Sequence, residues 1–129
     1  MTNDYEIILE ATKGLLYMSE TDHPFEVAEV SPGESTEATV REMCGRQKEL
    51  TIEKISLDYF FRNMIKADAD GPQEEQQNAK RFQQLQQLLK VNLKGVEVYR
   101  LGTITVDAVI VGTLQNGNLL ILKTKLVET

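Results

Sequence analysis

The sequence has one cysteine, one histidine and no tryptophan among its 129 residues. A single thiol, Cys44, excludes an internal disulfide and a cysteine-based zinc site, so the chain suits a reducing compartment. Its apolar runs are far shorter than the roughly 20 residues that a membrane helix requires. No basic start followed by a long apolar run marks a signal peptide. We therefore expect a cytoplasmic protein without membrane contact.

The scarcity of histidine and cysteine also limits the classes of enzyme that this chain can belong to. A nucleophile and its base would have to be Cys44 and His23, yet EMCGR around Cys44 matches no known nucleophile signature. His23 has no second histidine to complete a typical metal site. ADADG resembles the start of a calcium loop, but the twelve-residue spacing with its closing glutamate is missing. We predict no enzymatic activity, no cofactor and no metal of its own.

Basic residues are scarce in the first third of the chain. Residues 1–40 contain nine acids and one base, Lys13, whereas residues 41–129 contain 11 acids and 13 bases. This asymmetry argues against direct nucleic-acid binding, which needs a basic footprint. An acidic surface would instead attract a basic protein partner. A solvated acidic face that only keeps the protein soluble would explain the same charges.

Three segments have the spacing of amphipathic helices. The first has its apolar stripe within residues 8–16, and Asn3 with Glu6 resembles its capped start. Gly14 either stops this helix or lies within it. The second covers residues 55–65, with Ser56 as the expected N-cap. The third opens at Pro72 and ends at Gly95. Their predicted buried residues are Ile8, Ala11, Thr12, Leu15 and Leu16, then Leu57, Phe60, Phe61, Met64 and Ile65, then Ala79, Phe82, Leu85, Leu88 and Leu89.

The region between the first two helices is harder to interpret. Residues 22–24 should break the first helix, because proline disfavours helical geometry in the residue before it. Residues 25–30 have a strand-like pattern, and SPGES at 31–35 indicates a turn. Residues 38–43 form a weak candidate for a returning strand, and residues 51–55 fit either a short strand or a connection.

The last third of the chain predicts antiparallel strands. Residues 96–101, 104–112 and 118–127 alternate, Gly102 permits a turn, and Asn116-Gly117 predicts a two-residue hairpin loop with positive φ at both positions. In LKTKLVET, alternation places Lys123 and Lys125 on one face and Thr124 on the other. We expect an α+β fold, a three-layer α-β-α sandwich whose central antiparallel sheet has helices on both faces.

Two stretches resemble the nuclease A inhibitor family: GLLYMSETDHPFEV (14–27) and VYRLGTITVDAVIVG…GNLLILKTKLVET (98–129). The likeness extends over nearly the whole chain in the same order, and is loose at residues 30–55 and 66–78. It implies a single inhibitor-like domain over residues 1–129, with a PR-1-like α-β-α sandwich. It also implies a bacterial, cytosolic protein that blocks a sugar-non-specific DNA/RNA endonuclease of the ββα-metal class. We expect a monomer that forms a 1:1 complex with that nuclease.

The resemblance further implies two principal contacts. Thr129 matches the C-terminal threonine with which the family reaches into the nuclease active site and approaches the nuclease's catalytic metal. Its carboxylate and hydroxyl are hard oxygen ligands suited to Mg²⁺ or Mn²⁺, and they would stand in for the scissile phosphate. Glu20, in the MSE motif, is similar to an acid that pairs with an active-site arginine of the nuclease.

Acids elsewhere in the chain are expected to support these contacts. The family loop before the long helix has an Asp-Trp pair; here KADADGP retains an acid at Asp68 or Asp70 and lacks the aromatic residue. Asp22 precedes the shared PFE segment (24–26), Glu26 is its last residue, and both acids would add to the electrostatic attraction. Because tryptophan is a common interface anchor, its absence leaves an alternative. The chain would then be a protein-interaction module of the same fold with a different basic partner.

Overall fold

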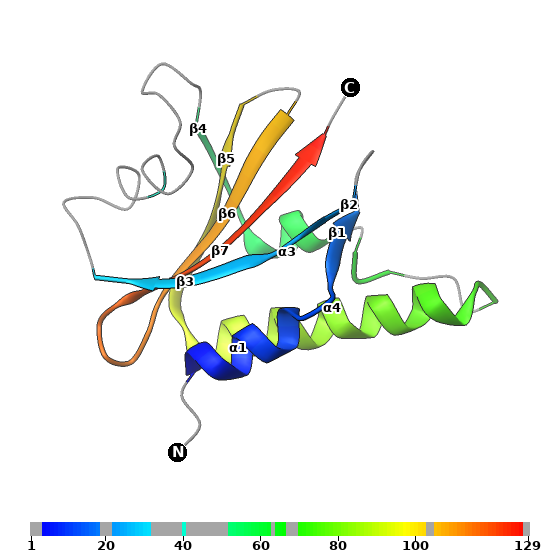
Figure 1. Ribbon diagram of the computed structural model, residues 1–129, viewed down its shortest axis with the longest axis horizontal. Coiled ribbons are helices and arrows are strands. Elements are labelled where there is room, and N and C mark those ends of the chain that lie inside the picture. Colours follow the sequence, from blue (N-terminus) through cyan, green and yellow to red (C-terminus); the bar gives the residue numbers. More distant parts are fainter. Residues whose placement is uncertain are drawn as a thin grey trace.

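The computed structural model describes residues 4–18, 22–31, 40, 52–62, 64–66, 70–102 and 105–127 (Figure 1). The helices with defined bounds are α1 (Asp4–Thr12), α3 (Leu57–Phe61) and α4 (Gln73–Asn92). The strands are β1 (Leu16–Met18), β2 (Asp22–Pro24), β3 (Glu26–Val30), β4 (Ile52–Ile55), β5 (Lys94–Leu101), β6 (Thr105–Thr113) and β7 (Leu119–Val127).

The main sheet has the order β3-β7-β6-β5-β4, and all of its neighbours are antiparallel. The three strands β5, β6 and β7 follow one another as a meander, as their alternating sequences predicted. For residues 51–55 the sequence allowed either a short strand or a connection. Ile52–Ile55 forms the edge strand β4. A separate two-stranded hairpin is formed by β1 and β2.

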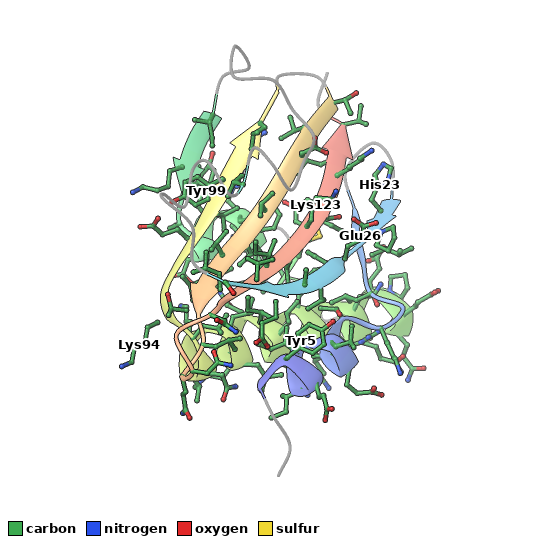
Figure 2. The ribbon with its side chains drawn as sticks, turned by 60° about the vertical axis from the view of Figure 1, so that its left-hand side comes forward. Tyr5, His23, Glu26, Lys94, Tyr99 and Lys123 are labelled. Carbon is green, nitrogen blue, oxygen red and sulfur yellow. The ribbon has the colours of Figure 1, made fainter. Side chains whose placement is uncertain are left out.

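Helices cover one face of this sheet. Ile8 of α1, Phe60 of α3 and Phe82 of α4 belong to one buried cluster with the sheet residues Ile110 and Leu122. Side chains two apart on a strand share a face, so alternate residues of β6 and β7 point toward the helices and belong to this cluster. Burial of such large apolar side chains contributes about 1.5–3 kcal/mol each. α1 also contacts β3, where the Tyr5 hydroxyl donates to the Val27 carbonyl at 3.4 Å (Figure 2).

The opposite face of the sheet is also apolar. A second buried cluster there contains Val40, Tyr99, Leu101, Val109, Val111, Leu119 and Ile121. Val40 is completely buried and lies within residues 32–50, the rest of which is outside the described residues. The mixed α/β class with a large antiparallel sheet is therefore confirmed. Helical cover of both faces, and with it the three-layer sandwich, stays a prediction.

Several predicted boundaries were wrong, each for a local reason. Residues 22–24 form strand β2 rather than a simple break, because they pair with β1. Leu16 begins β1 and is 40% exposed instead of lying on the first helical stripe, since α1 ends before Gly14, which has φ +69°. The second helix is the short α3, capped as expected by Ser56 Oγ, which accepts from Tyr59 N at 3.1 Å.

Two glycines have roles that differ from the predicted ones. Gly95 does not end the long helix: α4 ends at Asn92, and Gly95 lies in β5, where the register with β6 shifts. Only Gly117 has positive φ in the hairpin loop, so Asn116 does not. Gly117 N donates to Leu114 O at 3.0 Å and Leu114 N donates to Asn118 O at 2.8 Å. This is a three-residue loop with glycine at the left-handed position, not a two-residue loop.

None of the helices within the described ranges has both the length and the hydropathy needed to cross a membrane.

Candidate partner-binding site

The MSE motif begins at Met18, the last residue of β1, and β2 begins at Asp22. The hairpin pairs Leu16 with Pro24, Tyr17 with His23 and Met18 with Asp22. Residues 19–21, which include Glu20, are outside the described residues. The last pair of the hairpin therefore flanks the connection that contains Glu20.

Tyr17 fixes the base of this hairpin on the core. Its ring stacks on Phe60 at a centroid distance of 4.5 Å and an interplanar angle of 8°, and its hydroxyl donates to the Phe60 carbonyl at 2.9 Å. Phe25 and Phe82 meet the same ring edge-on, both at 6.4 Å. Such aromatic pairs contribute about 0.5–1.5 kcal/mol beyond the area that they bury. The hairpin is thus held by a side chain three residues before Glu20.

Thr124 joins the hairpin to the last strand. Its hydroxyl lies 3.0 Å from the Pro24 carbonyl oxygen and 3.3 Å from the His23 carbonyl oxygen, so it donates to the backbone of β2. Thr124 is only 3% exposed. Its place on the core-facing side of β7, opposite in direction to Lys123 and Lys125, agrees with the predicted alternation.

β7 remains paired up to its last residue. Thr105 of β6 faces Val127 in the register, so the strand predicted to precede Thr129 extends to Val127. Glu128 and Thr129 are outside the described residues. In Figure 1 the arrows of β1 and β7 point to the same end of the molecule. The sequence positions flanking Glu20 and Thr129 thus lie at one end of adjacent strands.

The two supporting acids of this region belong to consecutive strands. Asp22 is in β2 and Glu26 in β3. Glu26 forms an ion pair with Lys123 of β7 at 3.4 Å, and these side chains are 74% and 23% exposed. Because an exposed ion pair is screened by water, it contributes about 1 kcal/mol or less to stability. The charge of Glu26 is thus partly compensated by Lys123, an ion pair that the sequence pattern did not predict.

Asp70 lies at a different place. It is exposed and precedes α4, whose first turn contains Glu74 and Glu75. Gln76 Nε2 donates to Gly71 O at 2.9 Å and closes this loop on the helix. Figure 1 places the start of α4 far to the right, whereas β7 ends at the top. Asp68 is outside the described residues.

Sequence reasoning missed the two residues that position this region, Tyr17 and Thr124. Tyr17 was read as part of a motif without a role. Thr124 had a usable signal, because it is a polar residue at a core-facing position between Leu122 and Leu126. A hydroxyl in such a place needs a hydrogen-bond partner, and the carbonyl groups of β2 are that partner.

The described residues contain no group of three or more His, Cys, Asp and Glu side chains that could hold a metal ion. His23 is a partly buried residue of β2. Cys44, which would be the nucleophile if His23 were its base, is outside the described residues.

The family model described as nuclease A inhibitor-like protein matches residues 3–129. The chain belongs to the nuclease A inhibitor-like family. Membership indicates a nuclease-inhibitor role, a nuclease as protein partner and a protein that is not itself an enzyme. No individual curated protein matches the sequence. The matched region includes residues 14–27 and 98–129, the two stretches that resemble the family in sequence. The hydrogen bond from Thr124 to the Pro24 carbonyl joins these two stretches.

Proposed function

We propose that this protein is a stoichiometric inhibitor of a non-specific ββα-metal endonuclease, acting as a single domain over residues 1–129. It blocks the nuclease active site with acidic side chains and with the carboxylate of Thr129. The observation that carries the proposal is the family match over residues 3–129, joined to the common end of the β1–β2 hairpin and β7.

The proposed roles follow from the chemistry of the cleft. A nuclease that cuts any sequence binds phosphates through basic side chains and a divalent metal. Thr129 approaches that metal with two kinds of hard oxygen ligand. Glu20 pairs with an active-site arginine, and a desolvated Arg–carboxylate pair has two parallel hydrogen bonds. Neither role requires a catalytic residue on the inhibitor.

The reach of the chain is compatible with one cleft. Thr129 is two positions after Val127, and Glu20 is two positions before Asp22. Each pair spans at most about 7 Å, because a residue extends the chain by about 3.3 Å. The anchors behind both segments are the aromatic contacts of Tyr17 and the hydrogen bonds of Thr124. Anchoring before binding reduces the entropy lost when the contacts form.

Asp22, Glu26 and either Asp68 or Asp70 are proposed as electrostatic support. Glu26 is 74% exposed even though it faces Lys123, so its carboxylate is open to a partner. These acids add to the charge of residues 1–40, which increases the rate of encounter with a basic nuclease.

The test is a titration of a purified ββα-metal endonuclease with the intact protein and with a variant lacking Thr129, while DNA cleavage is followed. A Thr129→Ser variant serves as the matched control, since it keeps a hydroxyl and a carboxylate at the same chain length. We expect 1:1 inhibition by the intact and serine proteins and much weaker inhibition by the shortened one. Equal inhibition by all three would remove Thr129 from the mechanism.

A second function, binding of a different basic protein by the same fold, is favoured by the absence of tryptophan. It predicts no inhibition of any such nuclease at micromolar protein. It also predicts repeated recovery of one basic non-nuclease protein on the immobilised chain, lost in Glu20→Ala.

A further inference from the structure

A hollow of about 260 Å³ lies beside the β1–β2 hairpin. Its lining consists of His23, Pro24, Glu26, Lys123, Thr124 and Lys125. Figure 2 shows the side chains of His23, Glu26 and Lys123 gathered on the same side of the sheet. The hollow therefore adjoins the end of β7 that leads to Thr129.

The charge of this hollow differs from that of the whole protein. Lys123 and Lys125 lie two apart on β7 and share a face. Glu26 is the one acid of the lining and lies 3.4 Å from Lys123. Lys125 is exposed and has no ion pair within the described part of the chain. With His23 neutral, the lining has two positive charges and one negative charge, whereas the protein has a net charge of −6.

One further carboxylate is close in the register. Asp107 of β6 is the cross-strand partner of Lys125. It is only 3% exposed and does not line the hollow. Asp107 therefore cannot itself contact a partner at this surface. Its charge offsets part of the positive potential, and the exposed ammonium group of Lys125 is the group that a partner meets.

We propose that this hollow receives a carboxylate side chain of the partner nuclease. The inference rests on the proposed function. Thr129 is four positions after Lys125, a span of at most about 13 Å at 3.3 Å per residue. A nuclease that takes Thr129 into its cleft therefore brings the rim of that cleft over the hollow. Two lysines facing a uniformly basic rim would weaken binding, because like charges oppose each other across an interface.

The chemistry favours a protein carboxylate over a nucleic-acid phosphate. A lysine ammonium group has three donors for carboxylate oxygens. Non-specific nucleic-acid binding requires the neutralisation of many phosphates, and one net charge in an acidic protein does not supply that. The hollow then contributes specificity: the acids of the chain attract any basic nuclease, and Lys125 selects those with an acid at the rim.

The test compares Lys125→Glu with Lys94→Glu. Both lysines are exposed, and both changes alter the net charge from −6 to −8. Figure 2 places Lys94 on the side of the molecule away from His23 and Lys123, so it controls for overall charge. The readouts are the inhibition constant and the association and dissociation rates with a purified ββα-metal endonuclease. Lys125→Arg tests whether a retained charge preserves binding.

We expect Lys125→Glu to weaken inhibition about 10-fold, mainly through faster dissociation, as rupture of a close interfacial charge contact does. Lys94→Glu should leave the inhibition constant within about 2-fold of the original or tighten it, and Lys125→Arg should remain near the original. Equal effects of Lys125→Glu and Lys94→Glu would overturn the proposal. Binding of a short DNA duplex to the isolated protein through Lys125 would assign the hollow to phosphate and would also overturn it.

A measurement on the free protein separates this inference from the proposed function. If the intact chain inhibits none of the nucleases, the proposed function fails and titration with acetate, followed by amide NMR shifts, decides the hollow alone. Saturable shifts at His23, Thr124 and Lys125 that disappear in Lys125→Glu would support an anion-accepting hollow. Absence of such shifts would overturn it.

Discussion

The acidic residues at the two ends of the main sheet have different partners. At the end where β6 turns into β7, Glu29 accepts from Asn116 Nδ2 at 3.3 Å and from Asn118 Nδ2 at 2.8 Å. At the end near the β1–β2 hairpin, Glu26 of the same strand is 74% exposed and contacts the partly exposed Lys123 at 3.4 Å. Both side chains are exposed, but the carboxylate of Glu29 accepts hydrogen bonds from a turn of its own chain, whereas that of Glu26 is paired with a lysine.

The backbone shows the same contrast. The turn end is closed by its own hydrogen bonds between Leu114, Gly117 and Asn118. The hairpin end depends on side chains from distant parts of the chain, Tyr17 on Phe60 and Thr124 on the β2 carbonyl groups. A partner-binding surface needs charged side chains whose backbone is fixed in position but whose charged groups stay available to the partner. The hairpin end meets that requirement better than the turn end.

The largest expected effect is at the hairpin end. Glu20→Ala should weaken nuclease inhibition by about 2–5 kcal/mol, because it leaves a buried arginine of the nuclease without its partner. The melting temperature should stay the same, as measured by circular dichroism. Glu29→Ala is the matched acid at the turn end and should inhibit normally. A drop in melting temperature for Glu20→Ala would make Glu20 a structural residue and remove the contrast.

The turn half of the sheet should respond in stability alone. A Cβ placed on Gly112 of β6 would meet Leu93 Cβ at 2.8 Å and Leu93 Cδ1 at 2.7 Å. Gly112→Ala should therefore destabilise the fold by about 1–3 kcal/mol through overpacking, measured by urea denaturation. Inhibition per folded molecule should be unchanged. Weaker inhibition by the folded fraction would show that strain at Leu93 reaches the hairpin end.

Thr124→Val tests the link between the hairpin and β7. The change keeps the shape and removes the hydroxyl that donates to the His23 and Pro24 carbonyl groups. We expect a loss of about 0.5–1.5 kcal/mol in unfolding free energy and a measurable rise in the inhibition constant. Thr113→Val makes the same change at the other end of the sheet and should leave inhibition unaltered. Similar inhibition by both valine variants would mean that the link does not position Glu20.

The smallest effect is expected from Glu29→Gln. Its side chain can still accept from Asn116 and Asn118, and the site is exposed. Such surface changes usually stay within about 0.5 kcal/mol, and chemical denaturation measures them. A larger loss would show that the charge of Glu29, and not only its acceptor, maintains the turn.

Long periodic segments were predictable because one local pattern determined each of them. The stripe of Phe82, Leu85 and Leu89 indicated α4, and alternation indicated β5, β6 and β7. Short segments were less predictable, since three residues of β2 are strand only through their pairing with β1. The loop at Asn116 also departed from its dipeptide signal, because the register of β6 and β7 selected a three-residue loop.

The candidate site divides in the same way. The motif resemblance indicated the family, and the family match over residues 3–129 confirmed it. It also indicated Glu20 and Thr129, which remain proposals. The ion pair of Glu26 with Lys123 and the grouping of His23, Lys123 and Lys125 were not visible in the sequence. They depend on the pairing of β3 with β7, which joins residues 97 positions apart in the case of Glu26 and Lys123.

The sequence by itself determined the amphipathic α4, the β5–β6–β7 meander, the acidic first third and the family, because each is a local pattern or a matching string of residues. Only the tertiary structure decided that the β1–β2 hairpin lies beside the last strand and that a hollow lined by Lys123 and Lys125 adjoins both. Long-range pairing and core packing determine those positions, and neither is encoded in any single stretch of the chain.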